Sequence, residues 1–290
     1  MPRVRRKKKE SLVIFGGSGF VGLAIVKEMQ SNQDLRIILA DVNPPGDCEG
    51  AEYHFCDMTD VSAVDSLIKN ENCISVIHLA SVGMSGAAML DSDSEKINVD
   101  GVKSVLLSCN KYKVKALIYA STYNTVFGGQ EIINGNNDLP YYPYELYTDY
   151  YSRSKRIAEE LVISSNTTSS TLSTTVLRPA AIYGEGEMRH FPRIVHHMDN
   201  GIFGFQIQEI GKHAIVDWVH GENLAQAFVK VLDKLLDSNK HTKFTSEPAV
   251  TNRSTSTSTS CAGKIYAISD GTPVDSFAFL KPLCKARKID

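Results

Sequence analysis

Short runs of hydrophobic residues alternate with segments of helical period through the first part of the chain. Continuous apolar runs of this kind are typical of strands that are buried on both faces. The predicted strands are Ser11–Phe15, Arg36–Ala40, Ile74–Leu79 and Ala116–Ala120, with a weaker one at Tyr53–Cys56. The predicted helices between them are Phe20–Gln30, Val61–Lys69 and Ser94–Lys111. This alternation predicts an α/β fold with a doubly wound parallel sheet.

The second half of the chain is less regular. Asp149–Ile163 has helical spacing, and Thr175–Arg178 reads as a strand that ends before a proline. Asn223–Leu236 is a strong amphipathic helix, and Ile265–Ile268 resumes as a strand. The length therefore suits one large domain with a smaller appendage.

Polar and charged segments interrupt this pattern. The first ten residues are basic and no apolar run follows them, which argues against a secretory signal and predicts a disordered tail over 1–10. Alternatively, this tail could be a nuclear localisation signal or could contact a membrane electrostatically. Ser164–Thr174 is mostly Ser, Thr and Asn and predicts a surface loop. The Ser/Thr-rich stretch at 238–262 predicts a disordered polar insertion.

Composition narrows the functional classes. Of the 290 residues, 42% are hydrophobic and 22% are charged, which is ordinary for a globular protein. The net charge of −2 creates no field that favours nucleic acid or an anionic membrane, so we expect no nucleic-acid partner. No stretch reaches the roughly 18 apolar residues that a membrane helix needs. The six cysteines form no Cys-x-x-Cys pair, which favours a reducing, cytoplasmic compartment.

A glycine-rich segment lies between the first predicted strand and the first predicted helix. Gly16, Gly19 and Gly22 form the pattern Gly-x-x-Gly-x-x-Gly. The first glycine permits a tight turn, the second lets the backbone approach a pyrophosphate, and the third lets helix and strand pack closely. The N–H groups that open the helix, at Phe20 and Val21, suit an anion. The segment predicts a dinucleotide site, with a merely structural glycine turn as the alternative.

Two acidic residues follow the second and third predicted strands. Asp41 stands nineteen positions after Gly22. A carboxylate there accepts hydrogen bonds from the ribose hydroxyls and repels a 2′-phosphate, which favours NAD over NADP. Asp57 follows the third strand, and we interpret it as an adenine contact or as the N-cap of the next helix.

Tyr151 and Lys155 form the single Tyr-x-x-x-Lys pattern of the chain. Residues four apart share one face of a helix. A phenol has a pKa of about 10, and a nearby ammonium lowers that pKa by favouring the phenolate. The pair therefore predicts a general acid/base for an alcohol–ketone interconversion. A hydroxyl at Ser121 or Thr122, after the strand that ends at Ala120, could hydrogen-bond the substrate oxygen.

With these segments in hand, the chain resembles the extended short-chain dehydrogenase/reductases, and within them the 3β-hydroxysteroid dehydrogenase branch. The segments that carry the resemblance are Phe15–Gly22, His78–Ser81, Tyr119–Gly129, Tyr151–Lys155, Leu177–Gly184 and Asp217–His220. Two further runs, Phe191–Val195 and Ile268–Pro273, look most like the atypical family 42E members of that branch. The resemblance extends over most of the chain and keeps the family order.

The resemblance implies an NAD-dependent oxidoreductase that interconverts a secondary alcohol and a ketone on a 3β-hydroxysteroid or another apolar, sterol-like substrate. It implies that Tyr151 donates and accepts the proton, and that Lys155 binds the nicotinamide ribose and tunes Tyr151. Thr122 aligns with the catalytic hydroxyl of the family, and Ser121 is the fallback because this segment is one residue longer than in many relatives.

Other roles that the resemblance implies concern the cofactor and the domains. Ala80 would line the adenosine side, and Pro179 and Ile182 would hold the nicotinamide amide, all by backbone groups. Residues 11–182 would form the NAD-binding, Rossmann-type domain with the catalytic helix, and 183–290 mainly a small substrate-binding subdomain.

Assembly and location also follow from the resemblance. In relatives, the helices that match Ser94–Lys111 and Asp149–Ile163 pair across a two-fold axis, so we expect a homodimer. Relatives often continue into a hydrophobic, membrane-associated tail that this chain does not reach before Asp290. We therefore expect a cytoplasmic protein, at most peripheral to the endoplasmic reticulum membrane, with membrane attachment only through such a tail.

Metal and pocket residues give weaker signals. No metal site is predicted, because the histidines share no ligand spacing with acidic or Cys partners; these are His190, His196, His197, His213 and His220. Several apolar residues could line a substrate pocket or form ordinary core, namely Phe191, Ile202, Phe203, Phe205 and Ile207.

Two alternative functions remain open at this point. A nucleotide-sugar epimerase or reductase on the same scaffold would need cations for a second pyrophosphate, and only Arg189, Arg193 and Lys212 are present in 185–215. A non-catalytic NAD-binding scaffold protein would have no reason to keep the Tyr151–Lys155 pair.

Overall fold

A seven-stranded parallel sheet forms the centre of the molecule. The computed structural model describes residues 8–30, 34–167, 170–202, 214–241 and 260–288. The strand order is β10-β6-β5-β4-β1-β2-β3, and every neighbouring pair is parallel. The strands are β1 (Ser11–Phe15), β2 (Arg36–Asp41), β3 (Glu52–Phe55), β4 (Cys73–His78), β5 (Ala116–Ala120), β6 (Ser173–Pro179) and β10 (Lys264–Ile268). The order reverses between β1 and β4, which confirms the predicted doubly wound fold.

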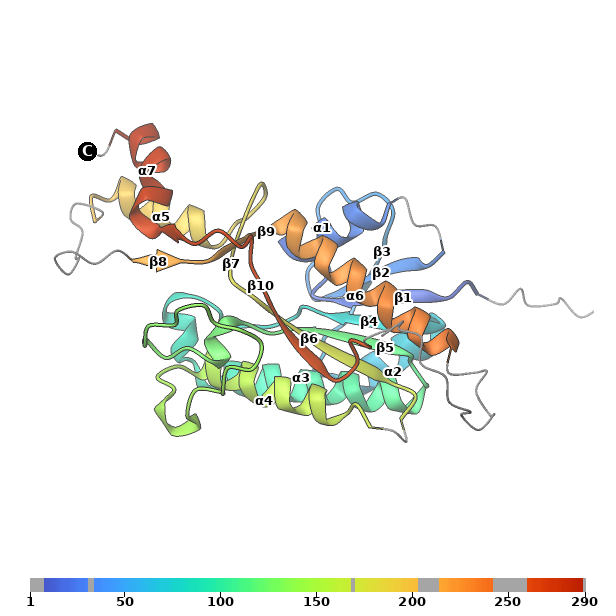
Figure 1. The fold of residues 1–290 in the computed structure, drawn as a ribbon. Coiled ribbons are helices and arrows are strands. Elements are labelled where there is room, and N and C mark those ends of the chain that lie inside the picture. Colours follow the sequence, from blue (N-terminus) through green and yellow to red (C-terminus); the bar gives the residue numbers. More distant parts are fainter. Residues whose placement is uncertain (1–7, 31–33, 168–169, 203–213, 242–259, 289–290) are drawn as a thin grey trace, which may run out of the picture.

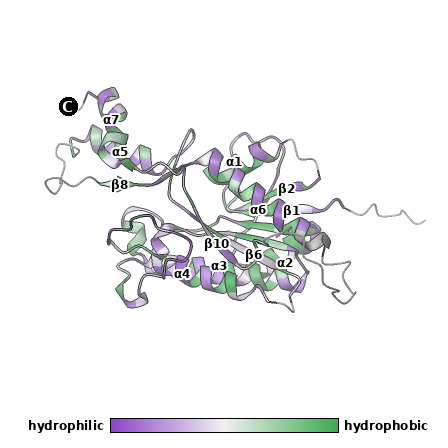
Figure 2. Ribbon diagram, in the orientation of Figure 1, coloured by the Kyte–Doolittle hydropathy of each residue, from purple (hydrophilic) through white to green (hydrophobic). Residues whose placement is uncertain are grey.

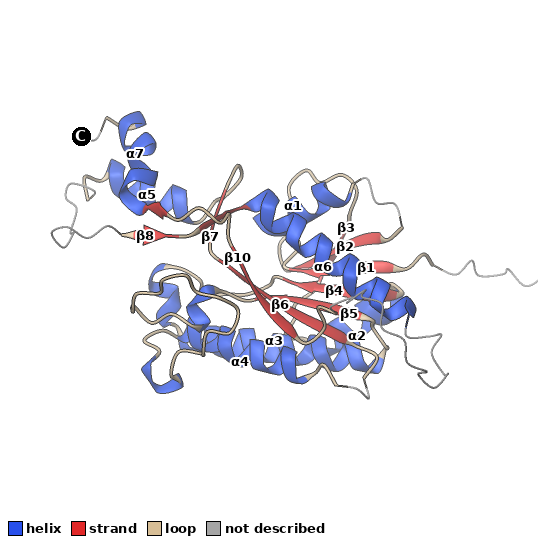
Figure 3. Ribbon diagram, viewed as in Figure 1, coloured by secondary structure: helices blue, strands red, loops and turns tan. Residues whose placement is uncertain are grey.

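Helices cover both faces of the sheet (Figures 1 and 3). One face is covered by α1 (Phe20–Met29) and α6 (Gly221–His241). The other face is covered by α2 (Val61–Asn70), α3 (Ser92–Lys111) and α4 (Tyr150–Ser164). In the described part of the chain, short 3₁₀ turns lie in the loops at η1 (Gly86–Leu90), η2 (Tyr123–Thr125) and η3 (Tyr144–Leu146).

Alternation along the strands fills these two layers. All five residues of β1 are buried. Val13 and Phe15 face the layer of α2, α3 and α4, whereas Leu12 and Ile14 face that of α1 and α6. The helices carry both hydrophobic and hydrophilic residues along their length (Figure 2). No helix in the described part of the chain has the length and apolar character needed to cross a membrane.

A smaller unit lies beyond the carboxyl ends of the central strands (Figure 1). It contains α5 (His190–Asp199), α7 (Ser276–Ala286) and two small sheets, β8 (Ile215–Val216) with β11 (Val274–Asp275) and β7 (Ala181–Tyr183) with β9 (Trp218–His220). An aromatic cluster holds it together: Trp218 stacks on Phe279 at 4.5 Å between ring centroids, and Phe191 lies 6.1 Å from Trp218.

Three segments differ from the sequence-based expectations. The proposed boundary after residue 182 does not divide the sheet, because α6 packs on α1 and β10 pairs with β6. The polar segment expected at 238–262 begins inside α6, which continues to His241, and Cys261 near its end is buried; residues 242–259 lie outside the described part. At the amino end, Lys8 pairs with Glu71 at 2.5 Å, while residues 1–7 lie outside the description.

Candidate active site

The glycine loop joins β1 to α1 at the carboxyl edge of the sheet. Gly16 has a φ of +74°, and a Cβ there would lie 2.6 Å from the backbone nitrogen of Ala80. A Cβ on Gly22 would lie 2.3 Å from the carbonyl oxygen of Gly17. Gly19 is different, since the nearest atom to a Cβ there would be the carbonyl oxygen of Gly16 in the same loop, 3.4 Å away. Gly16 and Gly22 are therefore required by packing within the protein, whereas the space beside Gly19 is open to a ligand. We call this space the glycine cradle.

Polar groups beside this cradle fit a dinucleotide. The N–H of Ser18 donates to Asp41 Oδ2 and the N–H of Asn43 donates to Asp41 Oδ1, both at 3.1 Å. Ser18 Oγ is buried and has no hydrogen-bond partner among the described residues. Gly19 offers no side chain to cap α1, so the first-turn N–H groups, including those of Phe20 and Val21, remain available to an anion. The residues present therefore fit the predicted cofactor.

The remaining cofactor candidates lie along the same edge. The N–H of Ala80 donates to Phe15 O at 3.0 Å, which places Ala80 against the glycine turn. Pro179 is the last residue of β6, and Ile182 in β7 pairs with Val219 of β9. Phe20 also has a structural part, since a Cβ on Gly221 would lie 2.5 Å from its ring.

Asp57 does not cap the next helix. Asp60 is the N-cap of α2 and accepts the N–H groups of Ser62 and Ala63. Asp57 Oδ1 instead accepts hydrogen bonds from the N–H and hydroxyl of Thr59, at 2.9 and 2.8 Å. The N-cap alternative is therefore wrong, and the adenine contact stays a prediction.

Tyr151 lies in the first turn of α4, which begins where Asp149 accepts the N–H of Ser152 at 2.6 Å. Its side chain is buried, and burial raises the pKa of Tyr151 to about 12. The Arg189 guanidinium and a hydrogen bond with Ser81 oppose that rise, while the Asp149 carboxylate adds to it. The cation that lowers this pKa most is therefore one that the sequence pattern did not single out.

Lys155 lies one turn further along α4 and is 1% exposed. Its Nζ donates to the carbonyl oxygen of Ala120 at 2.5 Å and lies 4.2 Å from the centre of the Tyr119 ring. Burial lowers the pKa of Lys155 to about 7, and the Glu159 carboxylate counters part of this shift. The ammonium is held at the end of β5.

The two hydroxyl candidates have different partners. Ser121 Oγ donates to Glu159 Oε2 at 2.5 Å, and Glu159 forms a buried ion pair with Arg178 at 2.5 Å. Thr122 is the N-cap of η2 and accepts the N–H of Asn124 at 3.3 Å. Ser121 is thus committed to an internal network, which leaves Thr122 as the better candidate to meet a substrate.

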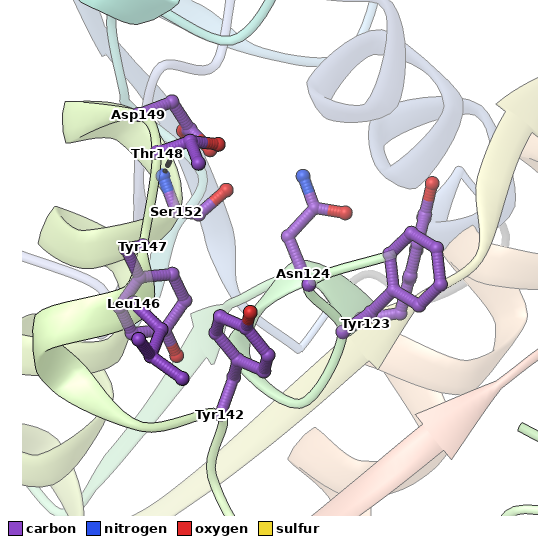
Figure 4. A pocket seen from close by; sticks show the side chains of 10 residues that line it. Tyr123, Asn124, Tyr142, Leu146, Tyr147, Thr148, Asp149 and Ser152 are labelled. Atoms are coloured by element: carbon purple, nitrogen blue, oxygen red, sulfur yellow. Dashed lines mark hydrogen bonds between the residues drawn. The ribbon is translucent and has the colours of Figure 1, made fainter. Parts of the chain in front are cut away.

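A cavity of about 260 Å³ opens beside the first turn of α4 (Figure 4). In Figure 4 the side chains of Asn124, Tyr142 and Ser152 surround it. Its other lining residues are Tyr123, Phe127, Gly128, Leu146, Tyr147, Thr148 and Asp149. The tyrosine-rich segment before α4 therefore lines a space beside the first turn of that helix. Of the residues expected to line an apolar pocket, Phe191 packs in the aromatic cluster, Ile202 is exposed, and Phe203, Phe205 and Ile207 lie outside the described part.

Several residues near Tyr151 were missed by sequence reasoning. Asn98 of α3 binds both backbone groups of Val82, at 2.8 and 3.0 Å, and donates to Ser154 Oγ at 2.9 Å. It ties the loop that carries Ser81 to α4. Glu159 could have been found as a further i+4 step after Lys155, but nothing in the sequence marks Asn98.

One group of side chains has the composition of a metal site. Ligand atoms of Glu52, His54 and Glu71 lie within 4.8 Å of one another. Arg36 bridges the two carboxylates at 2.7 and 3.1 Å, and Lys8 also pairs with Glu71. Because these cations already balance the acidic groups, the cluster is an ion-pair network at the start of the sheet.

Comparisons with known proteins give the chain its relatives. The model of the 3-beta hydroxysteroid dehydrogenase/isomerase family matches residues 13–290. Short-chain dehydrogenase/reductase family 42E member 1 of Danio rerio is 38% identical over 285 residues, which covers 96% of this chain and 68% of that protein. A decarboxylating sterol-4-alpha-carboxylate 3-dehydrogenase of Saccharomyces cerevisiae is 29% identical over 96% of this chain and 76% of that protein.

Solved structures support the fold. The UDP-glucose 4-epimerase of Thermus thermophilus in complex with NAD superposes with a TM-score of 0.69 at 20% identity, over 97% of this chain and 84% of that chain. At this identity the likeness concerns the fold alone.

Proposed function

The chain belongs to the 3-beta hydroxysteroid dehydrogenase/isomerase family, and from this premise we propose that it is an NAD-dependent dehydrogenase for the secondary hydroxyl of a 3β-hydroxysteroid or other sterol-like substrate. At the coarser level it is an NAD-dependent oxidoreductase of the short-chain dehydrogenase/reductase type. The observation that carries the proposal is the buried Tyr151–Lys155 pair on α4, at the same sheet edge as the glycine cradle.

The chain's own residues hold the cofactor and move the proton. The loop from Gly16 to Gly22 would hold the pyrophosphate, and Asp41 the adenosine ribose. Ala80 would contact the adenosine side, and Pro179 and Ile182 the nicotinamide side. NAD held by these residues would supply the hydride acceptor for the oxidation of the alcohol.

Proton transfer falls to Tyr151, whose Oη takes the proton of the substrate hydroxyl. Thr122 orients the substrate oxygen. Lys155 binds the nicotinamide ribose from its place below Ala120. Burial raises the pKa of Tyr151 to about 12, so cations near its hydroxyl are needed to make the phenol a usable base.

Assembly and location complete the proposal. We propose a homodimer that pairs through α3 and α4, which lie side by side on one face of the sheet (Figure 1). We place the protein in the cytoplasm, at most peripheral to the endoplasmic reticulum membrane. All six cysteines are free thiols, which supports a reducing compartment.

Formation of NADH over a substrate panel tests the function. The panel contains 3β-hydroxysteroids, their 3α epimers as matched controls, and UDP-sugars, each with NAD and with NADP. We expect turnover of 3β-hydroxysteroids only, and NAD preferred at least about tenfold because Asp41 repels a 2′-phosphate. Turnover of UDP-sugars alone would instead establish the nucleotide-sugar reading, and failure of every alcohol to react would favour a scaffold protein.

A further inference from the structure

An aromatic cavity lies between η2, η3 and the first turn of α4 (Figure 4). Its volume is about 260 Å³, and four of its lining side chains are aromatic, namely Tyr123, Phe127, Tyr142 and Tyr147. Tyr151 is not among its lining residues, so the proposed proton transfer does not use this space. We call it the tyrosine cavity.

The aromatic rings form two pairs. The ring centroids of Tyr123 and Phe127 are 5.8 Å apart, and those of Tyr142 and Tyr147 are 5.4 Å apart in an edge-to-face arrangement. In Figure 4, Tyr123 and Tyr147 lie on opposite sides of the cavity and Tyr142 lies between them. A ligand in the cavity therefore has aromatic rings on more than one side.

The second pair of rings is held in place by the protein core. Tyr147 Oη donates to the carbonyl oxygen of Thr125 at 2.7 Å, and the N–H of Tyr142 donates to the same oxygen at 3.0 Å. Thr125 is fully buried. Gly128 leaves room for the Tyr142 ring, because a Cβ there would overlap that ring. These rings are in position before a ligand binds, which lowers the entropy lost on binding.

The charge of the lining is negative. Asp149 is the one charged lining residue in the described part of the chain. Its Oδ1 accepts the N–H of Ser152 at 2.6 Å, and its second oxygen has no hydrogen-bond partner among the described residues. Arg153 and Arg156 of the same helix already form ion pairs with glutamates. The cavity therefore disfavours an anion and leaves a carboxylate available to a cation.

We propose that the tyrosine cavity binds the methylated ammonium group of a small organic cation. The negative faces of the aromatic rings attract such a group, and the Asp149 carboxylate balances its charge. Methylation suits this lining, because an ammonium without methyl groups is strongly hydrated and needs several hydrogen-bond acceptors. A neutral ligand of the same shape would keep the apolar contacts and lose both attractions.

A matched pair of probes tests the charge. Choline and 3,3-dimethylbutan-1-ol have the same shape, but the second carries a neutral carbon in place of the ammonium nitrogen. Binding is measured by calorimetry and by saturation-transfer NMR of the methyl protons, without NAD and at an ionic strength held constant with sodium chloride. We expect the wild type to bind choline at least about tenfold more tightly than the neutral alcohol.

Variants separate the ring from the charge. Tyr123→Leu should weaken choline by about 2- to 30-fold, the range of one cation–π contact, whereas Tyr123→Phe keeps the ring and should bind choline as the wild type does. Phe127→Leu removes the other ring of that pair and replaces Tyr123→Leu if the latter folds poorly. Asp149→Asn should weaken choline by about 3- to 10-fold and leave the neutral alcohol unchanged, because asparagine still caps α4.

The control for the charge is Glu145→Gln. Glu145 lies in η3, is exposed and does not line the cavity, so this variant should change the affinity for either probe less than about twofold. Equal losses of choline affinity in Glu145→Gln and Asp149→Asn would overturn the inference. Equal affinity of the wild type for both probes, or unchanged choline affinity in both Tyr123→Leu and Phe127→Leu, would also overturn it.

Kinetics with a 3β-hydroxysteroid decide where the cation comes from. Choline that raises the KM of the steroid at constant kcat would show that the ammonium group belongs to the substrate. Choline that binds without changing the KM would be a separate ligand. The site is supported in both cases, and also if no steroid reacts, because binding is measured without turnover.

Discussion

At the scale of single residues, the site is governed by burial and by the charges that oppose it. Burial raises the pKa of Tyr151 to about 12, and it lowers the pKa of Lys155 to about 7. Both shifts disfavour the charged forms, as expected in a site that excludes water. Arg189 and Ser81 act in the other direction on Tyr151. The protein therefore supplies the tyrosine with compensating partners from outside its own helix.

Removal of the Tyr151 hydroxyl separates chemistry from cofactor binding. Tyr151→Phe should lower turnover by about 10²–10⁴, because the group that accepts the alcohol proton is gone. The dissociation constant for NAD should stay within a few-fold, because the residues proposed to hold the pyrophosphate and the adenosine half are unchanged. Turnover is measured by the absorbance of NADH, and the dissociation constant for NAD is measured by calorimetry.

Two variants control that experiment. Tyr150→Phe removes the hydroxyl of the neighbouring tyrosine, whose ring stacks under the Arg153 guanidinium. This variant should leave turnover and NAD affinity unchanged. Lys155→Ala should lose turnover and NAD affinity together, because Lys155 serves the ribose as well. More than about a third of wild-type turnover in Tyr151→Phe would contradict the mechanism, because the mechanism requires Tyr151 as the general base.

The buried His78 should make the protein sensitive to acid. Its ring lies between Phe15 and Tyr119, at 6.0 and 5.4 Å between centroids, and neither ring nitrogen has a partner among the described residues. Burial, together with the Lys155 charge, lowers its pKa to about 3. An unfolded histidine binds its proton below a pH of about 6.5, so between these values the unfolded state binds more protons.

The free energy of unfolding should therefore fall as the pH drops below about 6.5, by about 1.4 kcal/mol per unit from this group. Urea unfolding at pH values of about 5 and 7.5 should show that His78→Phe is about 2 kcal/mol less acid-sensitive than the wild type. His78→Leu is a second variant in case the larger ring fits poorly. An identical pH dependence in the wild type and both variants would disprove the role of His78.

Sequence reasoning predicts site residues whose proposed roles depend on local spacing. Gly16 and Gly22 lie in one loop, and Tyr151 and Lys155 lie four positions apart on one helix, so both patterns are visible in the chain. Arg189 and Ser81 act on Tyr151 from distant segments that only the folded sheet brings together. Their pairing is a tertiary property and has no local signal.

At the scale of elements, the glycine loop allows packing and ligand binding to be tested apart. Gly22→Ala should lower the free energy of unfolding by about 1–3 kcal/mol, because the new Cβ would meet Gly17 O at 2.3 Å. Gly19→Ala should cost less than about 1 kcal/mol yet weaken NAD at least about tenfold, because its Cβ fills the cradle. Thermal unfolding and calorimetry measure the two effects.

A surface glycine gives the control for these variants. Gly46→Ala meets no atom within 4 Å and should leave stability and NAD affinity nearly unchanged. If Gly19→Ala bound NAD as tightly as the wild type, the cradle would not be the pyrophosphate site.

The buried ion pair between Glu159 of α4 and Arg178 of β6 fixes α4 on the sheet. Their side chains are 0% and 5% exposed. Glu159→Ala leaves Arg178 unpaired and should cost about 3–5 kcal/mol in urea unfolding. The double variant Glu159→Leu/Arg178→Met should recover most of that loss.

The neighbouring carboxylate is the matched control. Glu160 pairs with Arg156 and is 47% exposed, so Glu160→Ala should cost less than about 1 kcal/mol. Equal losses in Glu159→Ala and Glu160→Ala would show that burial does not decide the strength of the pair.

The elements that sequence reasoning missed have physical causes. Pro192 reads as an interruption, yet it lies in the first turn of α5, where a proline's missing N–H costs nothing. A strand was expected at Ile265–Ile268, and the structure has one at Lys264–Ile268. Its pairing with β6 was not expected, because strand neighbours are set by tertiary packing rather than by local pattern.

At the scale of the whole molecule, the chain returns to its first domain before it ends. The strand β10 pairs with β6, and α6 covers the sheet beside α1, although both follow the small unit's first residues. The last strand of the sheet therefore lies between two segments of the small unit, which resumes with β11 and α7. Hydrophobic patterning predicts that β10 is a strand but not that it pairs with β6. That pairing depends on which edge of the sheet remains open after β6 is in place.

The proposed homodimer is the last prediction, and α3 provides its most direct test. Leu107 on this helix is 65% exposed, beside an α4 that packs along it. Light scattering should give twice the chain mass of 31.9 kDa at micromolar concentration. Leu107→Glu should shift the population to monomer, because a charge in an apolar contact leaves an unpaired ion. Phe55→Glu, on the edge strand β3 with 71% exposure, is the control and should stay dimeric. A wild-type mass of 31.9 kDa would rule out the assembly.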